Sequence, residues 1–181
     1  MTIRTYQDIT PSLGKEVYID PSAVVIGDVE IGDHSSVWPM TVIRGDVQSI
    51  RIGQCTSIQD GSILHVTHRG PHNPEGFALH IGDYVTIGHK VTLHGCTIDD
   101  HCLIGMGSIV MDGAHIQKQV IVGAGSLVPP GKILDSGFLW VGSPVKKIRP
   151  LTEKEMGFFG YSAEGYKNLK QKHMESISGS D

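Results

Sequence analysis

Aromatic residues, cysteines and long hydrophobic runs are all scarce in this sequence. Aromatic residues make up 6% of the 181 positions whereas 39% are hydrophobic, so the core must be built from aliphatic side chains. The three cysteines, Cys55, Cys96 and Cys102, are odd in number and scattered, which argues against a disulfide framework and for reduced thiols. The length fits one domain with a sizeable core.

The sequence also lacks the features that direct a protein to membranes or nucleic acids. Residues 1–14 contain no apolar segment of the kind that a signal peptide needs, and no later window approaches the ~20 apolar residues of a membrane span. The formal net charge is -4, so there is no basic excess to attract phosphate groups. We therefore predict a cytoplasmic protein that binds neither membranes nor nucleic acid.

A hydrophobic period of six residues runs through most of the chain. Ile81, Ile87 and Leu93 mark three successive repeats, and the residue two positions before a repeat is mostly small or β-branched. The same spacing runs from Leu13 to Ile43, from Ile52 to Leu64 and from Ile98 to Val128. Neither a helical period nor a simple strand alternation reproduces it, whereas a hexapeptide β-helix does. We predict an all-β solenoid, a parallel β-helix in which three short strands form each coil of a triangular prism.

The β-helix is predicted to occupy residues 1–145. It is interrupted by an inserted loop at about residues 66–78, which is rich in glycine, proline and histidine. Residues 146–181 are predicted to form a helical extension and a tail. Thr152 and Glu155 have the spacing of a capping box that would begin the helix.

Four residues of this extension follow one another at the spacing of one helix face, which predicts a helical segment: Tyr166, Leu169, His173 and Ile177. The last four residues, 178–181, are small or acidic and predict a loose tail.

The repeat places three polar residues in one vertical stack. Arg44, His65 and His94 each directly follow the third-strand residue of successive coils, provided that the insertions lie at corners. Neighbouring strands are ~4.8 Å apart. His65 and His94 can therefore point outward side by side and share a metal ion at the ~2.0–2.1 Å that zinc requires.

His89 belongs to a different part of the coil. It follows Ile87 by two residues, around a corner and up to ~16 Å of extended chain from His94. The economical solution is that His89 completes the site of a neighbouring subunit, and a three-sided prism that repeats this contact closes as a homotrimer. Asp60 occupies the same column one coil below, with Gln59 beside it, so an acid and an amide should lie next to the metal.

Outward histidines on a solenoid are usually solvated surface residues. We interpret four of the remaining histidines in this way: His34, His101, His115 and His173. The joint placement of His65, His89 and His94 is what favours a metal site.

Three motifs in this order resemble the γ-class carbonic anhydrase family, over about residues 10–170. They are Arg44-Gly45-Asp46, Gln59-Asp60-x4-His65 and His89-x4-His94. A lone Arg-Gly-Asp or His-x4-His would be weak evidence, but the ordered set on hexapeptide repeats is specific.

The resemblance implies a left-handed coil, whereas the general rule for parallel crossovers predicts a right-handed one. It also implies that His65 and His94 of one subunit and His89 of the next bind zinc, or iron(II) in the cell. Three neutral histidines leave the ion its charge and an open position, so that bound water reaches a pKa near 7.

The resemblance further assigns roles to the polar residues of the motifs. Arg44, Asp46 and Asp60 resemble the family's intersubunit ion-pair residues, and Gln59 resembles the residue that orients metal-bound water. The implied reaction is the reversible hydration of carbon dioxide to bicarbonate, by attack of metal-bound hydroxide at a subunit interface.

Two departures from the family's pattern predict slow turnover. Val47 stands where the best-known members carry a glutamate, and the 66–78 loop offers only Glu75, His68 and His72 in place of an acidic proton-exporting loop. Because a proton must leave in every cycle, we expect hydration to be limited by proton export.

Two other functions remain open. One is a structural or binding homologue without hydratase activity. The other is a hexapeptide acyltransferase, which would share the coil and the exit at Gly142-Ser143-Pro144 but would use one histidine as general base with a thioester donor. An acyltransferase has no need of three histidines beside Arg44, Asp46, Gln59 and Asp60.

Overall fold

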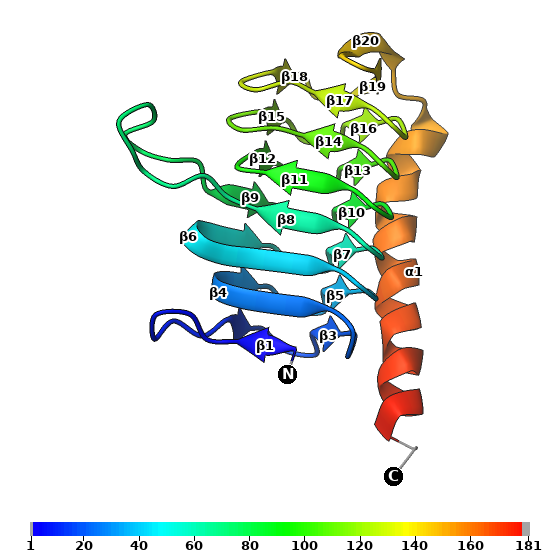
Figure 1. The fold of residues 1–181 in the computed structure, drawn as a ribbon. Helices are drawn as coiled ribbons and strands as arrows, with labels where there is room; N and C mark the ends of the chain where they lie inside the picture. Colours follow the sequence, from blue (N-terminus) through cyan, green and yellow to red (C-terminus); the bar gives the residue numbers. More distant parts are fainter. Residues whose placement is uncertain (1, 179–181) are drawn as a thin grey trace.

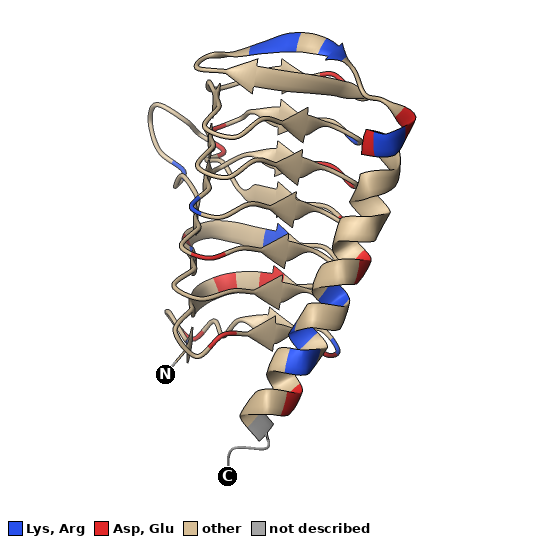
Figure 2. Cartoon of the chain, turned by 90° about the vertical axis from the view of Figure 1, so that its right-hand side faces the viewer, with Lys and Arg blue, Asp and Glu red and all other residues tan. Residues whose placement is uncertain are grey.

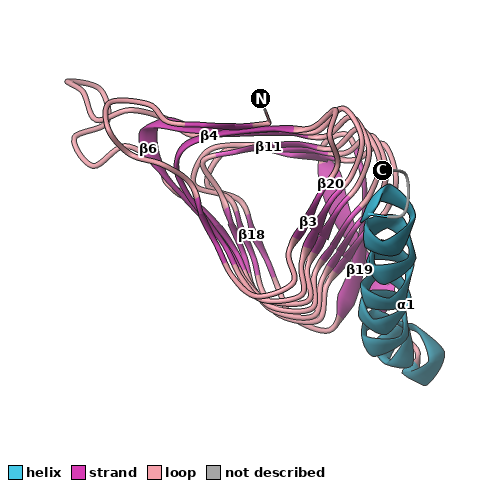
Figure 3. Ribbon diagram, turned by 90° about the horizontal axis from the view of Figure 1, so that it is seen from below, coloured by secondary structure: helices cyan, strands magenta, loops and turns pink. Residues whose placement is uncertain are grey.

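A computed structural model describes residues 2–178, which coil into a triangular prism of short strands with one helix along its side (Figures 1 and 3). Each coil contributes one strand to each of three faces. Face A contains β1 (Ile3–Arg4), the first parts of β4 (Val24–Ile31) and β6 (Val42–Ile52), β8 (Ile63–His65), β11 (Thr92–His94), β14 (Ile109–Val110) and β17 (Leu127–Val128).

The other two faces follow in the same way around each coil. Face B contains β2 (Ser12–Leu13), the later parts of β4 and β6, β9 (Leu79–Ile81), β12 (Thr97–Ile98), β15 (His115–Ile116) and β18 (Ile133–Leu134). Face C contains β3 (Tyr18–Ile19), β5 (Ser36–Val37), β7 (Ser57–Ile58), β10 (Thr86–Ile87), β13 (Leu103–Ile104), β16 (Ile121–Val122), β19 (Phe138–Gly142) and the antiparallel β20 (Val145–Pro150).

The coil is left-handed, as the family resemblance implied. In Figure 1 the chain rises from bottom to top while the front strands β8, β11 and β14 run from right to left. The rule that favours right-handed crossovers describes connections that carry a helix back across the sheet. Here most connections within a coil are turns of a few residues, so that rule does not decide the hand.

The predicted aliphatic columns form the core. Ile43, Leu64 and Leu93 are fully buried and lie in register on successive coils of face A. The column continues through Val110 and Val128. Both the period of six and the register expected across the insertions are therefore confirmed.

Backbone in the left-handed region closes the corner between faces B and C. Cys55 and Tyr84 have φ of 52° and 56°, values that are costly for residues other than glycine. Hydrogen bonds to the preceding coil hold them there, because Cys55 N donates to Asp33 O at 2.9 Å and Tyr84 N donates to Gln54 O at 3.0 Å. The same corner thus repeats from coil to coil.

The repeat is broken three times, after Ile43, Leu64 and Leu93, and each break lies at the corner between faces A and B, which we call the A–B corner. The long strand β6 bends around it and pairs with β8 on one side and β9 on the other. The inserted loop 66–78 leaves the same corner as a hairpin, with antiparallel bridges between Thr67 and Phe77 and between Gly70 and Asn73. Figure 3 shows these segments projecting from the prism beside β6.

The helix α1 (Glu153–Ser178) runs down the outside of face C (Figure 1). The predicted capping box is present, since Thr152 N donates to Glu155 Oε2 at 2.8 Å and Glu155 N donates to Thr152 Oγ1 at 3.3 Å. The predicted division between residues 145 and 146 falls within β20, the second strand of the β19–β20 hairpin, and stays a prediction.

The predicted helical segment is confirmed, but its four residues at helix-face spacing do not all pack on the coil. Tyr166 and His173 contact the Trp38 ring, but Leu169 and Ile177 are 40% and 49% exposed. The buried stripe instead contains Lys170 at 1% exposure, because its long stem packs against the coil and its ammonium donates to Glu16 O. Of the predicted tail, residues 179–181 lie outside the described residues. No helix among residues 2–178 is long and apolar enough to cross a membrane.

Candidate metal centre

Two of the three predicted metal ligands lie side by side at the A–B corner. His65 and His94 are register partners at the ends of β8 and β11, and their ring centroids are 5.1 Å apart. His65 Nδ1 and His94 Nε2 face each other at 3.1 Å. Two nitrogens bound to one tetrahedral zinc ion at ~2.0–2.1 Å would be roughly 3.3 Å apart, so the donor spacing fits such an ion.

A carboxylate stands behind each ring. Asp46 Oδ1 is 3.0 Å from His65 Nε2, and Asp112 Oδ1 is 2.6 Å from His94 Nδ1. Thr67 Oγ1 in turn donates to Asp112 Oδ2 at 2.9 Å. Carboxylates behind ligating histidines fix the tautomer and the ring orientation, so this arrangement is typical of a metal site.

The Arg44-Gly45-Asp46 turn is shaped by a close approach of two strands. A Cβ at Gly45 would lie 2.5 Å from Asp28 O on β4, so only glycine allows the turn to sit so close. The turn places Arg44 in an ion pair with Asp46, which in turn contacts His65.

Burial and hydrogen bonding set the protonation of this pair. Burial raises the pKa of the Asp46 carboxyl, but hydrogen bonds from His65 and Arg44 outweigh it, so that the pKa lies below its ordinary value. Burial lowers the pKa of the His65 imidazole. Both shifts favour a neutral His65 beside an ionised Asp46 at neutral pH.

His89 lies at the opposite edge of face A, at the corner where the chain passes from face C to face A. We call this the C–A corner. His89 Nδ1 is 2.9 Å from Asp60 Oδ2 on the coil below, and both side chains are 48% exposed. Gln59 precedes Asp60 and is 5% exposed. Within residues 2–178 of a single chain, no group of three histidine, cysteine or acidic side chains is placed to hold a metal.

Two residues of this site were not predicted from the sequence. Asp112 contacts the His94 ring, and Thr67 donates a hydrogen bond to Asp112 from a different coil. Asp112 follows the core residue Val110 by two positions, so its column could have been recognised. Thr67 lies inside the inserted loop, where the period gives no position.

The fold and the histidine–carboxylate pairs together define a hexapeptide-repeat protein with a candidate metal site on its surface. The family described as bacterial transferase hexapeptide (six repeats) matches residues 10–45. A solved hexapeptide transferase family protein from Anaplasma phagocytophilum superimposes with a TM-score of 0.87 and 41% identity, over 94% of this chain and 97% of that one.

Curated relatives narrow the assignment. The chain is 53% identical to Protein YrdA of Escherichia coli (strain K12), over 96% of this chain and 94% of the relative. It is 45% identical to a carbonic anhydrase of Geobacillus kaustophilus, over 85% and 81%. It is 42% identical to gamma carbonic anhydrase 2, mitochondrial, of Arabidopsis thaliana, over 99% of this chain and 64% of that longer relative. The chain therefore belongs to the γ-class carbonic anhydrase family.

Proposed function

We propose that the protein binds a divalent metal ion, zinc or iron(II), between two subunits and catalyses the reversible hydration of carbon dioxide. The observation that carries this proposal is the facing pair of His65 Nδ1 and His94 Nε2 at 3.1 Å, each ring backed by a carboxylate. When bound, the ion would supply hydroxide at neutral pH by lowering the pKa of a coordinated water.

The chain's own residues orient both imidazoles towards one shared position. With a proton on His65 Nε2 held by Asp46 and a proton on His94 Nδ1 held by Asp112, the other nitrogen of each ring presents its lone pair to the shared position. The lowered pKa of His65 keeps protons from competing for that lone pair at neutral pH.

The third donor supports a homotrimer. His65 and His94 lie at one edge of face A and His89 lies at the other, so one copy's A–B corner can meet the C–A corner of the next copy. The outward residues between these edges are mostly apolar, with Ile63 50% exposed: Val24, Val42, Ile63, Thr92, Ile109 and Leu127. A head-to-tail contact of this kind that closes after three copies covers the face and completes three sites.

The residues of the C–A corner would serve the partner's ligands. Asp60 holds His89 Nδ1 and so leaves Nε2 available as the third donor. Gln59 adds an uncharged amide at this corner that can hydrogen-bond a substrate oxygen. Arg44 and Asp46, in their ion pair beside His65, would fix the facing edge.

The acyltransferase alternative is favoured by the names of the matching family and of the similar solved structure. It would require a thioester donor and one histidine as general base. It gives no reason for His65 and His94 to face each other with carboxylates behind them. A non-enzymatic metal-binding protein would share the site and differ only in lacking turnover.

Metal content and hydration measured on the same samples test the proposal. Zinc and iron are quantified per chain after aerobic and anaerobic purification, and hydration of carbon dioxide is followed by stopped-flow. We expect metal in His115→Ala, a matched control whose imidazole pairs with Asp99 on face B, and no metal or turnover in His94→Ala. Metal without turnover in any buffer would favour the binding protein, and calorimetric binding of acetyl-CoA in metal-free protein would favour the acyltransferase.

A further inference from the structure

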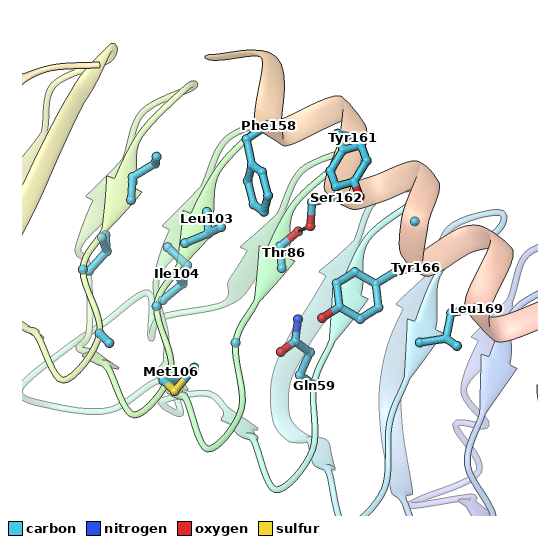
Figure 4. Close-up of a pocket in the computed structure, with 17 residues that line it drawn as sticks. Gln59, Thr86, Leu103, Ile104, Met106, Phe158, Tyr161, Ser162, Tyr166 and Leu169 are labelled. Carbon is cyan, nitrogen blue, oxygen red and sulfur yellow. Dashed lines mark hydrogen bonds between the residues drawn. The ribbon is translucent and has the colours of Figure 1, made fainter. Parts of the chain in front are cut away.

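A groove runs between α1 and the upper coils of face C. The helix packs on β3, β5 and β10, and the groove opens above them where α1 passes over β13 and β16. Its volume is about 560 Å3, within the ~300–1,000 Å3 of typical small-molecule sites. Figure 4 shows side chains from the helix and from the strands facing each other across this space. We call it the α1 groove.

The walls of the α1 groove carry no charge. Its floor is formed by β13 and β16, where Leu103 and Ile121 face outward and Ile104 and Val122 face the core, and all 17 residues that line it are uncharged. The helix residues 156–163 likewise include no charged residue. In Figure 2 this part of α1 is free of the blue and red bands that mark its lower half. A charged ligand would lose its hydration here without gaining a partner, so the lining selects an uncharged one.

Aromatic and aliphatic side chains of α1 form the outer wall. Phe158, Tyr161 and Leu169 are exposed and recur with Gly165 at three- or four-residue spacing, which puts them on one side of the helix. Gly165 lines the groove, and a Cβ built there would meet nothing within 4 Å. Glycine inside a helix is less favourable than alanine, so the open space at Gly165 is maintained at the expense of helix stability.

One amide side chain lies inside the groove. Gln59 is 5% exposed, and no hydrogen bond joins its amide to the other residues that line the groove (Figure 4). The other two buried polar side chains of the lining, Thr86 and Ser162, satisfy each other at 2.8 Å. The Gln59 amide therefore has hydrogen-bonding capacity left for the polar group of a ligand.

We propose that the α1 groove binds a small uncharged apolar molecule that carries one hydroxyl or carbonyl group. The apolar part lies between the helix stripe and the floor over β13 and β16, and the polar group hydrogen-bonds Gln59 at the end of the groove nearest the C–A corner. This site requires no metal. Because Gln59 also belongs to the proposed hydratase site, a bound molecule would reach that site from the side of the helix.

The binding test uses the full-length protein in its native oligomer and the neutral fluorescent probe N-phenyl-1-naphthylamine. We expect saturable binding, displaced by 1-decanol and about tenfold less effectively by decanoate at the same concentration. Gly165→Leu fills the groove and should weaken probe binding about tenfold or more. Gly160→Leu is the matched control, since Gly160 lies in the same helix with nothing within 4 Å of its Cβ but does not line the groove.

Each other outcome would overturn the proposal. Equal weakening by the two leucine variants would place the probe elsewhere, and equal displacement by decanoate would contradict selection for an uncharged ligand. Probe binding only after dissociation into single chains would mean that a second copy covers the groove. If Gly165→Leu does not fold, Ala124→Leu fills the groove from the strand side. None of these measurements of probe binding depends on hydration activity, so the test stays valid even if the hydratase proposal fails.

Discussion

Asp112 has the shortest contact to either of the facing histidines, and it is the residue whose role is easiest to isolate. Asp112→Asn keeps the shape but removes the charge that holds the proton on His94 Nδ1. Loss of such a carboxylate typically weakens metal binding by ~10–100-fold. We expect this loss for zinc in competition with a chromogenic chelator. Asp99→Asn, which alters the unrelated pair with His115 at 3.0 Å, should leave the affinity unchanged, and equal affinity in both variants would contradict the role given to Asp112.

Substitutions at Val47 test the expectation that turnover is limited by proton export. It is 44% exposed and directly follows Asp46, so a longer polar side chain there has room to reach solvent. Val47→Glu should raise kcat in weak buffer and reduce the acceleration by imidazole, because a carboxylate can accept the proton. Val47→Gln has nearly the same size and should behave like the unaltered protein. If the unaltered protein is already fast and indifferent to buffer, proton export does not limit it.

Single residues were predictable where the period fixed their columns. His65 and His94 were placed side by side because each follows a core residue by one position, and the register holds across the insertion. Thr67 was not predictable, because a hairpin inserted at a corner has no column. Lys170 was not predictable either, since a lysine is rarely buried and its placement depends on the Glu16 carbonyl, which lies 154 positions away.

The first turn of α1 gives the helix a pH dependence. Hydrogen bonds from Arg149 and from Thr152 lower the pKa of Glu155 to about 2, from 4.5. A folded-state pKa below the unfolded value means that the ionised form stabilises the folded chain. This contribution is complete above pH 4.5 and is lost as the pH falls towards 2.

We therefore expect Glu155→Gln to lower the thermal unfolding temperature at pH 7. The difference from the unaltered protein should shrink between pH 4.5 and pH 2 and disappear below it. Glu153→Gln, in the same turn, is the control for the general loss of an acid near the helix start. A difference that is constant over this pH range would show that the capping box does not carry the effect.

The strands depend on stacking rather than on their own length. Most strands have only two residues, so the packing of their inward side chains against the neighbouring coils supplies most of the stability of a coil. Ile104→Ala, at a fully buried position of β13, should cost ~2–5 kcal/mol. Ile133→Ala, on β18 with 54% exposure, should stay within ~0.5 kcal/mol. Denaturant unfolding at one protein concentration measures both, and similar costs would contradict the assignment of inward and outward columns.

Complementation between chains tests the quaternary arrangement. His89→Ala and His65→Ala alone should each lack a complete set of ligands. In a mixed trimer, the contact between the intact A–B corner of a His89→Ala chain and the intact C–A corner of a His65→Ala chain regains all three. We therefore expect metal and hydration to return when the two chains are refolded together.

The matched control mixes His65→Ala with His94→Ala. These two residues lie at the same corner, so no contact in any mixture contains both, and activity should stay absent. Recovery in this control would rule out a site shared between subunits. So would a protein that is a monomer by light scattering and still binds one metal ion per chain. The sequence suggested sharing because His89 is a corner away from His94, but a single chain cannot specify the angle at which two copies meet.

The path of α1 makes the first coils depend on a segment that is synthesised much later. Coils stack on coils that were made just before them, so the prism can grow as the chain leaves the ribosome. Tyr18 and Trp38, in contrast, pack against His173, and Glu16 receives Lys170. The aromatic surface of the early coils therefore stays uncovered during translation until α1 has been made and has folded back onto them.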